Sequence, residues 1–401
     1  MIHLVSFSAV TWNFPLVGRT RMLTEAWHAL GVPTTFVQVP FLRTTLEKLF
    51  PWGRAPEPIR VVRPWPTYPR RLWPHLSATR LRAGMAARAR ALRRQLDPLV
   101  DWRSAAAVIV SPAWTPWLDA LPFGAVLYDC IDDLAVHVPR PALAPLYQTW
   151  ETELIARASG AVVTAECLAA NLRRRRPELP IAIIRNGVDA ERFTRLAAAT
   201  PRPTDLPTGR RLVGFVGALY EWLDWELMVR VAAALPELDF VFVGPHHGRG
   251  RVRDLARLPN VRLLGRRPYA QVPAYVNAFD VCWVPFQPGN VAAAANPVKL
   301  YEYLALGKPV VSTPVADLET FGSLIQVAHG VEEMVSLLRA LVLQPPANAA
   351  ARVAFARANS WHSRARTLAD FAACLLPRQE RLTEPGTPVP GPWAPPSRAG
   401  F

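Results

Sequence analysis

The residues best suited to chemistry lie in segment 296–311 of the 401-residue chain. Asn296 can cap a helix whose first position is Pro297, and the free N–H groups of such a helix start attract phosphate. Lys299 and Glu302 are three residues apart, so they share one helix face. An ammonium there suits phosphate oxygens, and a carboxylate can accept hydrogen bonds from two ribose hydroxyls. The segment predicts a nucleotide diphosphate site, although an ordinary surface ion pair has the same spacing.

The use of lysine favours the first interpretation. The chain has 46 basic residues, but lysine occurs only at Lys48, Lys299 and Lys308. Two of the three lie in this segment, which indicates that a compact amine is needed there where arginine serves elsewhere. Lys308 follows a glycine and fits the end of the helix rather than a ligand.

A second polar cluster occurs in segment 128–137, which begins at the end of a predicted strand. Polar groups at that place should project toward a ligand. Asp129 and Asp132 could orient hydroxyl groups of an acceptor, and His137 could assist proton transfer. Each of the three could instead cap a helix or fix a loop.

Short apolar runs alternate with helical patterns through the chain and predict a parallel α/β fold. They fall at residues 2–8, 35–39, 106–110, 125–128 and 161–164, and, beyond a Pro-rich connector at 201–208, at 212–216, 240–243, 261–264, 281–284 and 310–312. This indicates two doubly wound domains, one over 1–186 and one over 187–345. Helices in 346–376 should pack back across the domains, followed by a disordered Pro-rich tail at 377–401. The Pro-rich stretch 51–74 predicts an excursion loop.

Composition sets limits on the partners and the setting. The formal charge of +15 suits an anionic partner, but the basic and aromatic residues do not form the pattern of a nucleic-acid module, so no nucleic acid is expected. Four widely spaced cysteines and the lack of a signal peptide indicate a reducing, cytoplasmic setting. The basic helical pattern at 77–96 could lie on an anionic membrane as a peripheral contact, or it could be a solvated outer face.

Several short motifs, in this order, resemble the retaining, family-four (group 1) nucleotide-sugar glycosyltransferases of GT-B architecture, over about residues 1–375. The motifs are Asn-Gly-Val-Asp at 186–189, Gly-Phe-Val-Gly at 214–217, Val-Gly-Pro at 243–245, Asn-Val-Arg-Leu-Leu-Gly at 260–265, Phe-Asp at 279–280 and segment 296–311. The chain looks most like bacterial enzymes of cell-surface polysaccharide assembly, of the teichuronic-acid type. The resemblance implies that the second domain binds the donor, with Gly217 in its glycine loop, Glu302 on the ribose, and Asn296, Pro297 and Lys299 near the pyrophosphate. It also implies that no metal and no cofactor other than the donor is needed, because protein cations and dipoles stabilise the leaving diphosphate.

The chain departs from the family pattern at three polar positions. Ala294 stands where a second Glu is common, and Ala218 and Asp224 stand where the family often has Arg and Lys on the donor phosphates. The missing charge could come from the first domain. Arg19, directly after Gly18 at the predicted start of the first helix, is the candidate, with an exposed Arg in a first helical turn as the alternative.

The resemblance implies a hexosyltransferase-type enzyme. It would move a sugar from a nucleotide diphosphate-sugar to a saccharide or lipid-linked acceptor in cell-envelope or exopolysaccharide assembly, with retention of configuration. Two other functions remain open. One is a nucleotide-sugar epimerase of the same fold, and the other is a non-catalytic nucleotide-sugar-binding GT-B partner protein.

Overall fold

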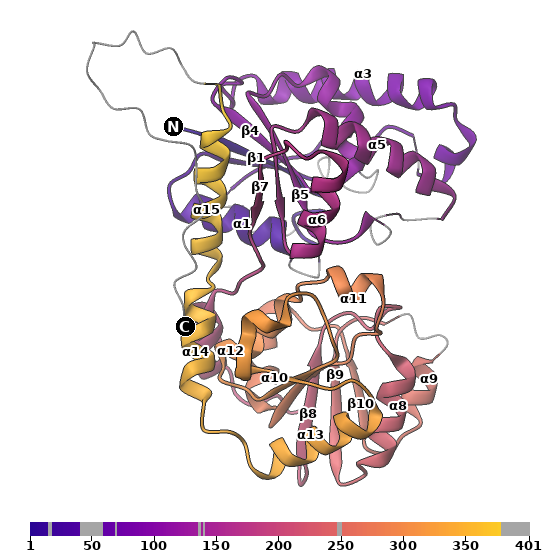
Figure 1. The fold of residues 1–401 in the computed structure, drawn as a ribbon, viewed down its shortest axis with the longest axis vertical. Coiled ribbons are helices and arrows are strands. Elements are labelled where there is room, and N and C mark those ends of the chain that lie inside the picture. The colour runs from indigo at the N-terminus through magenta and orange to yellow at the C-terminus, as the bar shows by residue number, and fades with distance from the viewer. Residues whose placement is uncertain are drawn as a thin grey trace.

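Two α/β domains follow each other along the chain, and a C-terminal helix returns along the first (Figure 1). The computed structural model describes residues 1–14, 18–40, 59–68, 70–134, 138, 141–246 and 251–377. Each domain is built around one parallel sheet with helices against it. The predicted fold class of two doubly wound, Rossmann-like domains is thereby confirmed.

The sheet of the N-terminal domain has seven strands in the order β3-β2-β1-β4-β5-β6-β7. They are β1 (His3–Phe7), β2 (Thr34–Val37), β3 (Arg60–Val62), β4 (Ala105–Ile109), β5 (Ala125–Cys130), β6 (Gly160–Val163) and β7 (Ile181–Ile183). Strand β4 is buried throughout, as expected where helices cover both faces of a sheet. The prediction of a loop throughout 51–74 is wrong at β3 and at 70–74, where the 3-10 helix η1 (Arg70–His75) begins. Three residues free of proline are enough to pair with β2 at the sheet edge, where Val37 lies opposite Val62.

Four α-helices accompany this sheet in the described part of the domain. They are α1 (Arg19–Ala29), α3 (Ala78–Leu96), α5 (Ala144–Arg157) and α6 (Glu166–Arg175), joined by the short 3-10 helices η1 (Arg70–His75), η2 (Pro112–Ala120) and η3 (Pro141–Leu143). Helix α3 begins where the Ser77 side chain accepts a hydrogen bond from the N–H of Arg80. It lies on the side of the domain away from the C-terminal domain (Figure 1). No helix among the described residues has the length and apolar character needed to cross a membrane.

The sheet of the C-terminal domain has six strands in the order β10-β9-β8-β11-β12-β13. They are β8 (Arg211–Val216), β9 (Leu238–Val243), β10 (Val261–Gly265), β11 (Val281–Val284), β12 (Val310–Ser312) and β13 (Gln326–Val327). The helices are α7 (Ala190–Ala199), α8 (Trp225–Ala234), α9 (Val252–Ala256), α10 (Val272–Ala278), α11 (Asn290–Ala294), α12 (Val298–Ala305), α13 (Val331–Leu343) and α14 (Ala349–Ala358), with 3-10 turns η4 (Tyr269–Gln271) and η5 (Leu318–Leu324). The strand order reverses between β8 and β11, and doubly wound sheets bind ligands at such a point.

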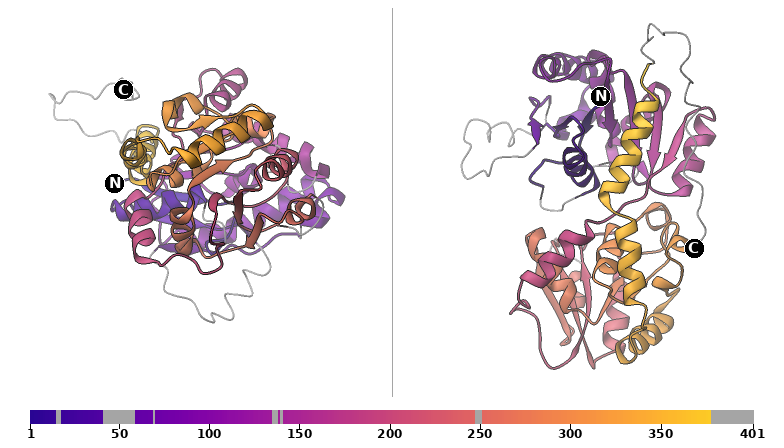
Figure 2. Two further views of the ribbon diagram at one scale, coloured as in Figure 1. Left: turned by 90° about the horizontal axis from the view of Figure 1, so that it is seen from below. Right: turned by 90° about the vertical axis from the view of Figure 1, so that its left-hand side faces the viewer.

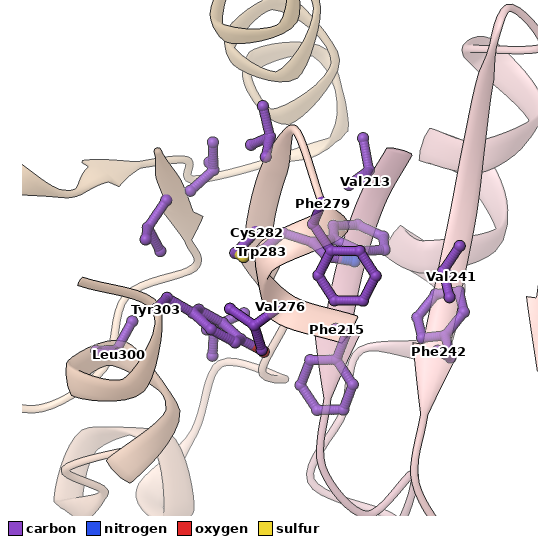
Figure 3. Close-up of a cluster of buried hydrophobic side chains, with 14 of the residues drawn as sticks. Val213, Phe215, Val241, Phe242, Val276, Phe279, Cys282, Trp283, Leu300 and Tyr303 are labelled. Atoms are coloured by element: carbon purple, nitrogen blue, oxygen red, sulfur yellow. The ribbon is translucent and has the colours of Figure 1, made fainter. Parts of the chain in front are cut away.

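Aromatic side chains fill the core beneath that point (Figure 3). The ring centroids of Phe242 and Trp283 are 5.9 Å apart, and both side chains are fully buried. Burying one side chain of this size contributes about 1.5–3 kcal/mol. Strand β8 has Gly214 here because a Cβ would lie 2.0 Å from the ring of Phe279. The carboxyl ends of the strands therefore rest on a tightly packed base.

The C-terminal helix α15 (Trp361–Cys374) belongs to the N-terminal domain by its contacts (Figure 2). It packs on α1, and the indole N–H of Trp27 donates a 2.8 Å hydrogen bond to the carbonyl of Ala365. The chain thus crosses between the domains twice. The two crossings lie side by side, since the N–H of Val188 donates to the carbonyl of Asn359 (3.2 Å).

Candidate functional site

A pocket of about 250 Å³ opens at the carboxyl ends of β8, β9 and β10, beside the first turn of α12. Its lining includes three residues predicted from the sequence, Gly217, Lys299 and Glu302. The lining also includes Gly244, Pro245, Arg266 and Tyr269, none of which was predicted as a site residue. The pocket lies where a doubly wound sheet binds its ligand.

A larger hollow of about 890 Å³ lies between α8 and α13, on the outer side of the C-terminal domain. Apolar side chains and charged groups line it, among them Arg230 and Glu332, whose side chains are 3.4 Å apart. It contains no residue predicted to act on a ligand and lies away from the ends of β8 and β9 that form the first pocket. The smaller pocket is therefore the candidate site.

Two glycines shape the floor of the pocket. Gly217 follows β8 with φ +153°, and Gly244 follows β9 with φ +158°. A Cβ on Gly244 would lie 1.8 Å from the carbonyl oxygen of Gly217, and a Cβ on Gly217 would come within 3.0 Å of Cε of Lys299. Both positions need glycine, and their bare backbones leave room for a ligand beside the lysine.

Lys299 projects from the first turn of α12 into an aromatic setting. Its Nζ lies 5.3 Å from the ring centroid of Phe215 and 5.0 Å from that of Phe286. Burial lowers the pKa of Lys299 to about 8, although Glu302 and Asp132 act to raise it. A poorly solvated ammonium of this kind gains more than an exposed one when an anion binds beside it.

Glu302 lies one turn further along α12 and is 7 % exposed. The hydroxyl of Tyr269 donates a 2.7 Å hydrogen bond to its Oε1. Burial raises the pKa of Glu302, while this hydrogen bond and Lys299 act in the opposite direction. The carboxylate keeps acceptor capacity for ligand hydroxyls. Tyr269 could have been found from its place just after the end of β10.

Asp132, in the N-terminal domain after β5, lies near Lys299 across the domain boundary. Burial and the neighbouring Asp133 raise the pKa of Asp132 to about 7, and Lys299 acts to lower it. The structure therefore places near each other two residues 167 positions apart, Asp132 predicted to orient hydroxyl groups and Lys299 predicted to bind phosphate. A carboxyl group that titrates near neutrality beside a cation suits proton transfer.

Arg19 and Asp129 are bound to each other instead of facing the pocket. The guanidinium Nε lies 3.1 Å from both carboxylate oxygens, and the side chains are 2 % and 1 % exposed. Arg19 also donates to the carbonyl of Arg185 and to Oδ1 of Asn186. With its groups used in this way, Arg19 is not placed as a free cation for donor phosphates, and Asp129 is not placed to orient an acceptor.

The expected helix cap at Asn296 is wrong. Helix α12 begins at Val298 after Pro297, which is the residue at the cap position, and no side chain caps it. The Oδ1 of Asn296 instead accepts the N–H of Asn186 (2.9 Å) and the hydroxyl of Tyr301 (3.2 Å). Asn296 is a suitable capping residue by type, but the sequence could not show that the backbone N–H of Asn186, in the other domain, takes its side-chain oxygen.

Two further predicted residues lie elsewhere. Gly18 is the residue before α1, and a Cβ there would meet nothing within 4 Å. Gly18 does not line the pocket. His137 lies outside the described residues.

The departures from the family pattern have structural explanations. The Asp224 carboxylate caps α8 by accepting the N–H of Leu227 at 2.9 Å. Ala294 is 5 % exposed and packs with the core of the N-terminal domain. Ala218 is buried at the pocket.

Two neighbouring arginines line the pocket with different surroundings. Arg267 is held by Asp205 (2.6 Å) and donates to the hydroxyl of Tyr275. Arg266 is exposed, and its guanidinium makes no hydrogen bond or ion pair with any described residue. Arg266 is thus a cation that remains available to a ligand. Within the described ranges, no three His, Cys, Asp or Glu side chains form a group that could hold a metal ion.

Comparison with known proteins gives a consistent picture. Residues 210–344 match the model of a family described as glycosyl transferases group 1. The putative teichuronic acid biosynthesis glycosyltransferase TuaH of Bacillus subtilis (strain 168) is 29% identical over 242 residues, which are 55% of this chain and 60% of that protein. The chain therefore matches less than two thirds of the length of this relative.

Solved structures of similar fold cover nearly the whole chain. Sucrose-phosphate synthase from Thermosynechococcus elongatus superposes with a TM-score of 0.68 at 17% identity, over 92% of this chain and 98% of that one. Anabaena Alr3699/HepE, in complex with UDP and glucose, gives 0.65 at 14% identity, over 92% and 99%. WaaG, a glycosyltransferase involved in lipopolysaccharide biosynthesis, gives 0.60 at 14% identity, over 92% and 99%. These likenesses establish the two-domain GT-B architecture.

Proposed function

We propose that the chain transfers a sugar from a nucleotide diphosphate-sugar to a saccharide acceptor, since residues 210–344 match the family model described as glycosyl transferases group 1. One observation carries the proposal. A glycine-floored pocket at the strand ends presents Lys299 and Glu302 from one helix, and Asp132 of the other domain is near enough to the lysine for their charges to interact. Phosphate, ribose and acceptor hydroxyl each have a matching group.

The donor would lie with its diphosphate at Gly217 and Lys299. The ammonium offsets the charge that builds on the leaving diphosphate as its bond to the anomeric carbon breaks. Arg266 follows β10 and supplies a second positive charge to the pocket. It would replace the cations that are missing at Ala218 and Asp224. The Glu302 carboxylate accepts hydrogen bonds from the ribose hydroxyls, held in place by Tyr269.

The acceptor hydroxyl would approach from the N-terminal domain. Asp132 orients it and, with a pKa of about 7, can take its proton as the oxygen bonds to the anomeric carbon. Retention of configuration is part of the proposal through the family resemblance alone, and no residue is assigned as a covalent nucleophile.

Calorimetry without added metal tests the donor site. The ligands are UDP, GDP, ADP and CDP with their common sugar conjugates, and the variant is Lys299→Met. Loss of a charge-assisted contact should weaken binding by about 10- to 100-fold. Lys308→Met is the matched control, because the Lys308 Nζ donates to the carbonyl of Asn277 away from the pocket. A folded protein that binds no member of the panel would refute the donor assignment.

Product analysis then separates the three functions. With acceptors added, a new glycoside supports transfer, and a rearranged or hydrolysed donor in their absence indicates an epimerase. An unchanged donor that is nevertheless bound indicates a non-catalytic partner protein. Because the relative TuaH is described for teichuronic acid biosynthesis, lipid-linked and free oligosaccharides of bacterial cell envelopes are the acceptors to test first.

We also propose that α3 makes a peripheral contact with an anionic membrane that carries a lipid-linked acceptor. Arg80, Arg90 and Arg94 are exposed on the helix face opposite its buried residues. Trp65 and Leu72 are 46% and 42% exposed in the segment that leads into α3. Basic residues with nearby exposed apolar side chains suit the surface of an anionic bilayer.

Vesicle co-sedimentation tests this contact, with phosphatidylglycerol vesicles compared with phosphatidylcholine vesicles. Each basic residue at such a surface contributes about 1 kcal/mol, so Arg90→Glu with Arg94→Glu should weaken binding at least about tenfold. The matched control is Arg195→Glu with Arg253→Glu, which changes the same charge on the C-terminal domain. Equal weakening by both pairs would show that only net charge matters and would contradict the proposal.

A further inference from the structure

Asp317 has an unusual backbone at the boundary between the domains. Its φ of +52° lies in the left-handed region, and no other described residue except glycine has a positive φ. Aspartate adopts this conformation more readily than most residues other than glycine, and here its contacts hold it there. The position directly precedes η5 and follows β12, in the C-terminal domain.

The contacts that hold Asp317 come from the N-terminal domain. Its Oδ2 lies 2.6 Å from Nη2 and 2.8 Å from Nε of Arg185. Both carboxylate oxygens also lie 3.3 Å from the backbone N–H of Glu166, the first residue of α6. The Asp317 side chain is 8% exposed, so this ion pair is largely shielded from water.

The residues around Asp317 extend the same contact. The N–H of Ala316 donates to the carbonyls of Ala292 and Ala295, which ties this loop to α11. Helix α11 lies against α6, and the Cys167 thiol of α6 donates to the carbonyl of Ala293 at 3.1 Å. Ala316 packs with the core of the N-terminal domain, as Ala294 does. A small, close-packed interface therefore surrounds the ion pair.

This interface lies directly before α12, the helix that carries Lys299 and Glu302. Helix α11 ends at Ala294, five residues before Lys299. The contacts of Asp317 and its neighbours with α6 and α11, here named the clasp, therefore fix the chain just before α12, which begins at Val298. We propose that Asp317 is a positioning residue: its ion pair with Arg185 holds α11 on α6 and so keeps Lys299 beside Asp132 of the other domain. The catalytic consequence rests on the proposed function, whereas the clasp itself does not.

The reactivity of the Cys167 thiol toward an alkylating reagent reports whether the clasp is closed, because this thiol contacts α11. Of the four cysteines, Cys130 and Cys282 are buried, whereas Cys167 and Cys374 are exposed, so Cys374→Ser leaves Cys167 as the accessible thiol. In that background, alkylation by iodoacetamide should be about threefold faster or more with Arg185→Gln, because the Cys167 thiol loses its hydrogen bond to the carbonyl of Ala293. Glu237→Gln is the control, since it removes an exposed ion pair within the C-terminal domain.

Arg185→Gln separates opening from simple electrostatics. Burial raises the pKa of Cys167, and the Asp317 carboxylate adds to this effect. Loss of the Arg185 cation leaves that carboxylate unbalanced, which disfavours the thiolate and would by itself slow alkylation. Faster alkylation therefore indicates opening. An unchanged or slower rate in a folded variant would overturn the proposal.

Asp317→Asn supplies the kinetic readout, because asparagine tolerates a positive φ but carries no charge. The donor pocket lies within the C-terminal domain, so the affinity for the nucleoside diphosphate bound by the wild type should stay within about twofold, while kcat falls about tenfold. Equal loss of affinity and kcat would point to damage of the fold and contradict a positioning role. Absence of nucleotide binding in the wild type would refute the proposed function and leave the alkylation result standing.

Discussion

The pH dependence of transfer follows from the pairing of Asp132 with Lys299. In the proposed mechanism, transfer needs the aspartate ionised, with a pKa of about 7, and the lysine protonated, with a pKa of about 8. At low donor concentration, kcat/KM reports the titration of the free enzyme. The active fraction should be greatest near pH 7.5 and about sixfold lower at pH 6, where most of Asp132 is protonated.

Asp132→Asn should change both limbs of this profile. The acid limb should disappear, because its titrating group is gone. The alkaline limb should move to lower pH, since Asp132 no longer acts to raise the pKa of Lys299. The maximum of kcat/KM should fall by about 10²- to 10⁴-fold, the usual contribution of a positioned acid or base.

Initial rates from about pH 5.5 to 9.5 provide the assay, with circular dichroism at each pH to show that the protein stays folded. Asp133→Asn is the matched control. It removes a neighbouring charge that raises the pKa of Asp132, so the acid limb should move to lower pH and remain present. If the acid limb survived unchanged in Asp132→Asn, a different group would control it, and the assignment of Asp132 would be refuted.

Three further predictions concern stability and donor binding. Arg266→Ala should weaken nucleotide-sugar binding about tenfold in calorimetry. Arg267→Ala should chiefly lower Tm, because Asp205 and Tyr275 hold this arginine. If Arg267→Ala weakened binding and Arg266→Ala did not, Arg266 would be excluded from the site. Asp129→Ala should lower the free energy of unfolding by about 3–5 kcal/mol in urea titration, because it leaves Arg19 buried without its partner. A loss below about 1 kcal/mol would contradict the stabilising role of this ion pair. Asp224→Ala should lower the free energy of unfolding by about 1 kcal/mol in the same titration, because α8 loses its cap, and it should leave nucleotide affinity unchanged. Weaker nucleotide binding by this variant would instead indicate that Asp224 contacts the donor.

Local patterns in the sequence were sufficient for the fold and for part of the site. The continuous apolar runs correspond to the main strands of both sheets, since a parallel strand buried on both faces needs an unbroken apolar run. The three-residue spacing places Lys299 and Glu302 on one side of α12, where both line the same pocket. Strands β3, β7 and β13 were not predicted; they are only two or three residues long, and β3 also lies among prolines.

The remaining features depend on contacts between distant parts of the chain. Arg19 and Asp129 are 110 residues apart, and nothing near either one shows that they neutralise each other. Asn296 carries a capping side chain, but Asn186 of the other domain binds its oxygen. Such choices between competing partners are made by tertiary structure, which a single sequence with short-range patterns does not reveal.

The return of α15 to the N-terminal domain has a consequence for biosynthesis. The Trp27 indole finds its hydrogen-bond acceptor at Ala365, 338 residues later, and α1 packs against α15. During translation the N-terminal domain emerges before the C-terminal domain, but it lacks this covering helix until residue 374 has left the ribosome. Its outer apolar surface stays open to water while the C-terminal domain is already complete, so the first domain to be made is the last to finish folding. A nascent chain stalled before residue 361 should expose that surface to chaperones, and a chain released beyond residue 374 should not.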